Sequence, residues 1–117
     1  MKYTARIANF GVEDLDGEIL TPNVMIKREL PVTWNFNGPV IGFAKALKDK
    51  TGIVAEIEIY DDGPFKRLAS LMTGVIGGSI LKRNGKKITK YRVDSVGLTL
   101  HPADPTLPKL QKLGEQE

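Results

Sequence analysis

Three groups of side chains in this sequence are chemically suited to catalysis or to binding a charged partner. The first group pairs the only histidine, His101, with a serine, since an imidazole can remove the proton of a serine hydroxyl. Ser79 is the serine that we consider first, because glycines at 74, 77 and 78 precede it. The spacing itself does not show that His101 and Ser79 are close. The other two groups are a basic run and an acidic run.

The basic run covers residues 82–92 and contains no acidic residue. Its six cations are Lys82, Arg83, Lys86, Lys87, Lys90 and Arg92. The whole chain carries a net charge of +3, so the remaining residues together carry −3. Three roles stay open: a charged strand edge that prevents aggregation, a site that docks on an acidic protein surface, and a phosphate contact. Nucleic acid is not favoured, because Tyr91 is the only base-stacking side chain in the run.

The acidic run consists of Glu13, Asp14, Asp16 and Glu18. Carboxylates at alternate positions are typical of calcium loops, which also need a central glycine and a glutamate at the twelfth place. With Gly17 as the central glycine, the twelfth place holds Asn23. We therefore expect a solvated loop and no metal site.

The composition excludes several classes of protein. The 117 residues include no cysteine, which excludes disulfide scaffolds, cysteine zinc sites and thiol catalysis. No apolar stretch approaches the roughly 18–20 residues that span a bilayer, and the first residues lack the apolar core of a signal peptide. We expect one intracellular domain, or one assembled inside a cell, with no cofactor and no membrane contact.

Short segments separated by glycine and proline must position these groups, and their pattern is mostly β. The expected strands cover residues 3–10, 32–36, 40–47, 53–60, 75–81, 87–93 and 96–100. Ile53, Ala55, Ile57 and Ile59 alternate with polar residues, as in a strand with one buried face. Asn84-Gly85 is a strong hairpin signal. A further turn is expected at Asn37-Gly38-Pro39.

One helix is expected between the strands. Asp61 or Asp62 would cap it, Pro64 suits its first turn and Gly74 would end it. Its apolar stripe would be Phe65, Leu68, Leu71 and Met72. The predicted fold class is therefore α+β: a strongly bent, mostly antiparallel sheet or small barrel of six to eight strands with one packed helix. Residues 1–104 would form this domain, and residues 105–117 a polar tail or docking arm.

Four motifs follow one another between residues 10 and 105. A D-x-x-G-[DE]-hydrophobic loop covers 14–19 and precedes Thr21-Pro22. An L-P-V-x-W-x-F motif covers 30–36, followed by P-V-I-G at 39–42. A G-x-x-x-x-S-I strand covers 74–80, and a strand ending in P-A-D-P covers 98–105. In this order they resemble the prohead (capsid maturation) protease family of tailed phages, whose fold is related to that of the herpesvirus assemblin protease.

The resemblance implies a role for three positions. In such proteases a histidine two places after the tryptophan is the general base, and a serine in the later strand is the nucleophile. Phe36 stands at the histidine position and Ser79 at the nucleophile position. Ser95 stands at the family's acidic position, and Asp94 is one residue away, on the opposite strand face. Because Phe36 cannot accept a proton, we expect a protease fold without protease chemistry.

The expected function follows from this resemblance. It is a non-enzymatic structural protein of a phage head, a decoration or stabilising protein that binds the major capsid protein in the virion and assembles in the host cytoplasm. A homo-oligomer is compatible with that role. The main alternative is an active maturation serine protease that uses Ser79 with His101. The third is a nucleic-acid-binding accessory protein that acts through residues 82–92.

Overall fold

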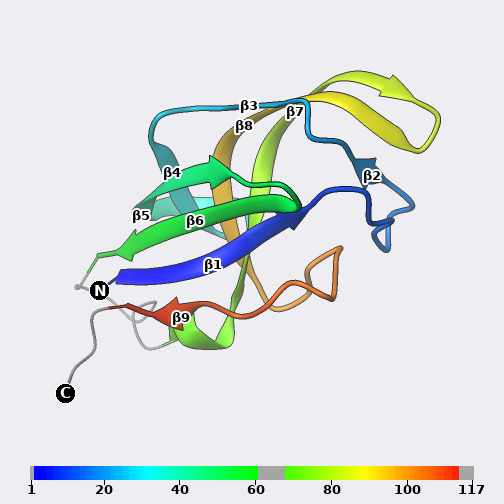
Figure 1. Ribbon diagram of the computed structural model, residues 1–117. Coiled ribbons are helices and arrows are strands. Elements are labelled where there is room, and N and C mark those ends of the chain that lie inside the picture. Colours follow the sequence, from blue (N-terminus) through cyan, green and yellow to red (C-terminus); the bar gives the residue numbers. More distant parts are fainter. Residues whose placement is uncertain (1, 61–67, 114–117) are drawn as a thin grey trace.

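The computed structural model describes residues 2–60 and 68–113 (Figure 1). Within them, nine strands form one mixed sheet. The strands are β1 (Lys2–Asn9), β2 (Ile19–Leu20), β3 (Val24–Ile26), β4 (Leu30–Trp34), β5 (Asn37–Lys48), β6 (Gly52–Ile59), β7 (Thr73–Asn84), β8 (Lys87–Thr99) and β9 (Gln111–Lys112). No helix in this part of the chain is long and apolar enough to span a membrane.

Strand β8 is the centre of the sheet because it forms strand pairs along both of its edges. One edge pairs with the antiparallel strand β7. The other edge pairs with three short parallel strands in succession: β2 near Ile88, β3 near Arg92 and β4 near Gly97. From β4 the sheet continues through β5, β6, β1 and β9 in antiparallel pairs.

The sheet bends until its first strand approaches β7, but no strand pairing joins β1 to β7 in the described residues. The two strands meet through side chains at one end of this seam. A methyl group added to Gly74 would lie 3.1 Å from the Ile7 side chain and 3.4 Å from that of Leu110. The amide of Leu110 also donates a hydrogen bond of 3.0 Å to the carbonyl of Met72. The fold is thus a barrel with one open seam.

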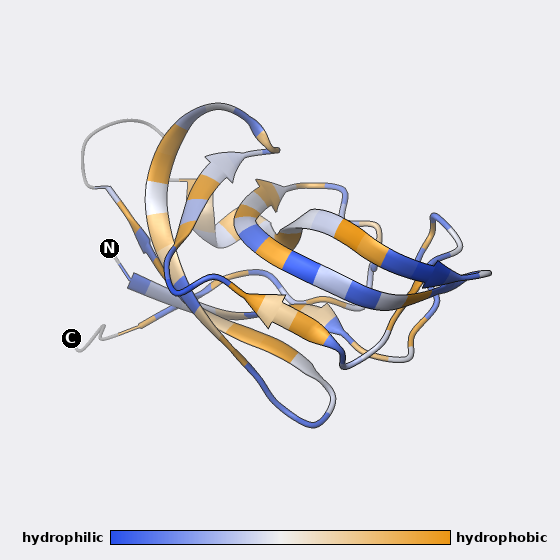
Figure 2. Cartoon of the chain, turned by 90° about the horizontal axis from the view of Figure 1, so that it is seen from above, coloured by the Kyte–Doolittle hydropathy of each residue, from blue (hydrophilic) through white to orange (hydrophobic). Residues whose placement is uncertain are grey.

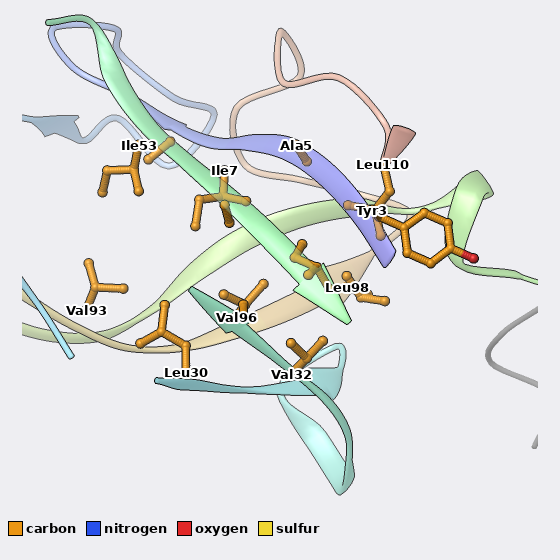
Figure 3. Packing of buried hydrophobic residues seen from close by; sticks show 14 of the residues in the cluster. Tyr3, Ala5, Ile7, Leu30, Val32, Ile53, Val93, Val96, Leu98 and Leu110 are labelled. Carbon is orange, nitrogen blue, oxygen red and sulfur yellow. The ribbon is translucent and has the colours of Figure 1, made fainter. Parts of the chain in front are cut away.

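The hydrophobic core fills the concave side of the bent sheet (Figure 3). The alternation expected in β6 is confirmed, since its isoleucines are buried while Glu56 and Glu58 are exposed. Strands β1, β4, β6 and β8 supply most of the side chains that are at most 1% exposed, and β5 and the turn before β7 add one alanine each: Ile7, Leu30, Val32, Ala44, Ile53, Ala55, Ile57, Ile59, Ala69, Val93, Val96 and Leu98. β-Branched residues dominate this set, which matches their preference for a half-buried pleated surface.

The prediction of an α+β fold with a packed helix was wrong. Residues 61–67 of the expected helix, including Phe65, lie outside the described residues. The rest forms a single 3-10 turn, Ala69–Leu71, after which Met72 is extended and β7 begins at Thr73. Leu68 and Leu71 are 40% and 54% exposed, so the expected apolar stripe does not form. Gly74 lies inside β7 instead of ending a helix, and a methyl group added there would press on the side chains of Ile7, Ile57 and Leu110.

Other expectations on the strands had mixed outcomes. The Asn84-Gly85 hairpin is confirmed, with Gly85 at a φ of 61°. The sheet is mixed: most of its strand pairs are antiparallel, as expected, but β2, β3 and β4 run parallel to β8. Part of the expected tail, residues 105–113, lies against the sheet: Leu110 is buried and β9 pairs with β1.

We predict that Ile57→Ala lowers the free energy of unfolding by about 2–5 kcal/mol, because it leaves a cavity in a core with little room to collapse. Ile57 is fully buried in β6. Leu47→Ala is the control, since Leu47 is 79% exposed on the neighbouring strand and should change stability by less than about 0.5 kcal/mol. Urea unfolding followed by circular dichroism measures both variants. Equal losses would contradict the described core.

Candidate functional site

A cavity of about 310 Å³ lies at the seam, beside the end of β1 and residues Val75 and Ile76 of β7. Four segments that are distant in sequence line it: the acidic loop after β1, the turn after β4, the middle of β7, and the segment after β8 (Figure 1). A backbone hydrogen bond of 2.7 Å from the amide of Leu15 to the carbonyl of Ala103 ties the first segment to the last. The cavity exists because β1 and β7 are not paired there.

The walls of the cavity differ in polarity. Its apolar part includes Ile7, Leu20, Ile76 and Ile88 together with the ring of Tyr91. Its acidic part consists of Asp14, Asp16, Glu18 and Asp104. The described lining includes no lysine or arginine, and its single basic ring is that of His101.

The acidic loop is held in shape by its own hydrogen bonds. Asp14 Oδ1 accepts one from the amide of Asp16 at 3.0 Å and another from the amide of Glu18 at 2.9 Å. As a result, Asp14, Asp16 and Glu18 each place a carboxylate oxygen within 4.8 Å of the others. These are the described residues that come nearest to a set of metal ligands. Arg83 forms an ion pair with Glu18 and so compensates one of the three charges.

Asp104 is the acid on the opposite rim. Its Oδ1 accepts hydrogen bonds from the Thr106 amide and hydroxyl, at 3.0 and 2.6 Å, and its Oδ2 accepts one from Asn9 Nδ2 at 3.0 Å. Burial raises the pKa of Asp104, but these hydrogen bonds outweigh it and hold the pKa below its ordinary value. On the inner wall, burial raises the pKa of Tyr91 to about 12, and the charges of Asp94 and Glu18 add to the effect. At neutral pH the site therefore has an ionised Asp104 and a neutral Tyr91.

Phe36 and Ser95, two of the positions implied by the protease resemblance, lie close together. A methyl group added to Gly77 would collide with both the Phe36 ring and Ser95 Oγ. One added to Gly97 would lie 2.6 Å from the same ring. Phe36 thus covers two glycines on adjacent strands. It does so from a tight turn in which Asn35 and Phe36 have φ values of 54° and 59°, two residues before the turn expected at Asn37.

Ser79 and His101 are not brought together. Ser79 lies opposite Arg92, whose guanidinium donates to Ser79 Oγ at 3.5 Å. His101 follows the end of β8, where its amide donates to Thr99 Oγ1 at 3.1 Å. Thr99 pairs with Thr73, which is six residues before Ser79 on β7. An extended strand of that length covers about 20 Å, far beyond the reach of a hydrogen bond.

The basic run forms the projecting hairpin of β7 and β8, whose far end is strongly hydrophilic (Figure 2). Acidic residues already compensate half of its cations. Arg83 pairs with Glu18, Lys86 with Glu13 at 3.4 Å, and Arg92 with Asp94 at 3.9 Å. The other three cations have no ion-pair partner within the described residues: Lys82, Lys87 and Lys90.

Comparison of the chain with models of protein families, with curated proteins and with solved structures found no match. The cavity could not be predicted from the sequence, because its walls come from segments whose proximity depends on the bend of the sheet. The acidic and basic runs were likewise not expected to contact each other. Their opposite charges were the signal that could have indicated the ion pairs of Arg83 and Lys86.

We predict an energetic coupling between Phe36 and Gly97. Gly97→Ala should lower the free energy of unfolding by about 1–3 kcal/mol, because the added methyl group collides with the ring. In the Phe36→Ala background the same change should cost less, by about 1 kcal/mol or more. Phe43→Ala is the matched control, since Phe43 is an aromatic residue of similar exposure whose ring is not among the atoms nearest to a methyl group added at Gly97. Urea unfolding measures the cycle, and additive losses in both backgrounds would contradict the contact.

We predict that Asp104→Asn reduces stability in a pH-dependent way. The folded-state pKa of Asp104 is lowered, so its contribution is present above the unfolded pKa of about 3.9 and is lost as the pH falls through the folded value. The variant should lose about 1 kcal/mol at pH 7, a value reduced for partial exposure, and the difference should close below pH 4. Thermal unfolding between pH 2 and pH 7 tests this. A constant difference across the range would assign the effect to packing instead of charge.

Proposed function

We propose that this chain is a non-enzymatic structural protein of a tailed-phage head, built on a fold related to the prohead proteases, and that it binds the major capsid protein. The observation that carries the proposal is where the four motifs lie. Residues from each of them line the cavity at the seam, namely the acidic loop, Phe36, Ile76 and the segment 101–104, whereas Ser79 and Ser95 lie outside its lining. Motifs that are far apart in sequence converge in this way around the active site of an enzyme, or around what remains of one.

The surroundings of the implied catalytic positions support a role without proteolysis. Phe36 occupies the position of the base, and its ring fills the space over Gly77 and Gly97. Ser79 accepts a hydrogen bond from Arg92, a donor that cannot remove its proton. A serine hydroxyl needs an adjacent base to become a nucleophile at neutral pH. Function in such a fold is then expected from its surfaces.

The hairpin of β7 and β8 is the surface best suited to hold a capsid subunit. It projects from the body of the protein, and Lys82, Lys87 and Lys90 are free of ion pairs within the described part of the chain. Cations on a projecting element favour an acidic partner surface and speed up association with it. Nucleic acid is the less suitable partner, because Tyr91 is partly buried and faces the cavity instead of an incoming base.

The experiment that tests the proposal is to count this protein in purified mature heads of its phage by quantitative mass spectrometry. Hundreds of uncleaved copies per head are expected for a protein that binds the capsid lattice. Its presence in precursor heads and absence from mature heads would instead support the maturation protease. Loss of capsid cleavage in a Ser79→Ala phage would then establish it. Absence from both kinds of head would overturn the capsid assignment.

We predict that Lys87→Gln and Lys90→Gln each weaken binding to purified heads that lack the protein, by about two- to five-fold, because each removes one charge, exposed at Lys87 and half-buried at Lys90, from the interface. Lys50→Gln is the matched control, since Lys50 lies in the turn between β5 and β6 and should leave binding unchanged. Co-sedimentation at low and at moderate salt measures the affinity, which should fall as salt rises. Equal effects of all three variants would remove the hairpin from the interface.

A further inference from the structure

We propose that the cavity at the seam binds an organic cation: an ammonium group carried on an apolar chain. The inference rests on the lining of the cavity alone and does not depend on the proposed role in a phage head. Its volume of about 310 Å³ falls at the lower end of the range of small-molecule sites, which are concave, mostly apolar and fitted with a few polar groups.

The apolar wall selects for the body of the ligand. Four aliphatic side chains line the cavity: Ile7 of β1, Leu20 of β2, Ile76 of β7 and Ile88 of β8. Chain atoms of a ligand placed among them leave water, which is favourable for each methylene that is buried. Tyr91 adds an aromatic ring to this wall, and a ring face attracts a cation as well as an apolar chain.

The acidic rim selects for the charge of the ligand. Four carboxylates line the cavity, whereas no lysine or arginine does so within the described residues. Arg83 compensates Glu18, and the backbone amides that bind Asp14 use only its Oδ1. The carboxylate of Asp16 is exposed and has no ion-pair partner in the part of the chain that the structure describes. An anion would meet uncompensated negative charge here, so the cavity favours a cation although the whole protein carries +3.

The rim is also fixed before any ligand arrives. Hydrogen bonds hold Asp14 and Asp104 in place, and the Leu15–Ala103 backbone bond joins the two sides of the opening. A fixed site loses little conformational entropy when it binds, which favours even a small ligand. Asp104 also stays ionised over most of the accessible pH range, because its hydrogen bonds lower its pKa.

The test is a titration of the full chain with hexylamine, followed by amide chemical shifts in two-dimensional NMR. We expect saturable shifts, in the millimolar range, at Leu20, Ile76 and Ile88. Hexanol and hexanoate are the matched probes of charge, and methylamine is the probe of the apolar chain. Both hexanol and hexanoate should bind more weakly than hexylamine. Methylamine should bind at least about four-fold more weakly, the effect of burying a single methylene.

Variants at the rim separate this site from adventitious binding. Asp16→Asn should weaken hexylamine binding by about two- to five-fold, since it removes one partly exposed charge, and Asp14→Asn in addition should weaken it further. The asparagine at position 14 keeps a side-chain oxygen that can accept the hydrogen bonds of the loop amides, so the loop should stay folded. Unchanged amide shifts outside the loop would verify this. Asp94→Asn is the control, because Asp94 is an acidic residue of β8 that does not line the cavity.

An ammonium on an apolar chain can come from a free amine or from the lysine side chain of a polypeptide. A second titration with an acetylated, amidated Leu-Lys-Leu peptide distinguishes the two sources. Binding of hexylamine alone assigns the cavity to small amines, and tighter binding of the peptide assigns it to a protein segment. Equal binding of hexylamine and hexanol, equal effects of Asp16→Asn and Asp94→Asn, or no saturable shift with either probe would overturn the proposal.

Discussion

The pairing of β8 on both of its edges is the interaction on which the rest of the structure depends. A strand of 13 residues that pairs with β7 on one side and with β2, β3 and β4 on the other leaves few of its backbone groups without a partner. The three short parallel strands follow one another along one edge of β8, and each is rotated relative to the one before it by the twist of β8. The sheet therefore coils around the core and brings β1 toward β7.

Three glycines permit close contacts between segments where the coiled sheet nearly closes. At Gly74 the side chains of Ile7 and Leu110 approach the backbone of β7 and seal one end of the seam. At Gly77 and Gly97 the ring of Phe36 covers the opposite face of the β7–β8 pair. Between these contacts β1 and β7 stay unpaired, and the cavity lies beside them.

Charge is distributed in a way that the net value of +3 conceals. The acidic loop and the basic hairpin are about 65 residues apart in sequence, yet Glu18 and Arg83 meet, as do Glu13 and Lys86. These pairs are exposed, so each adds little to stability. Their larger effect is on the surface: they leave a negative cavity on one side of the contact and free lysines on the hairpin beyond it. One region can in this way present opposite charges to two different partners.

The sequence by itself determined most of the strands and one of the hairpins. Period-two alternation in residues 53–59 and the Asn84-Gly85 pair are local signals, because side-chain direction and turn geometry depend on adjacent residues. The i, i+3 spacing of Leu68 and Leu71 is also local, but it indicated a helix wrongly, since the bent sheet takes Thr73–Asn84 into a strand beside β8. The tertiary structure alone decided that Phe36 covers two glycines, that Ser79 and His101 lie apart, and that four acids surround one cavity. Those contacts join residues tens of positions apart, and their geometry depends on the curvature of the whole sheet, to which every strand pair contributes.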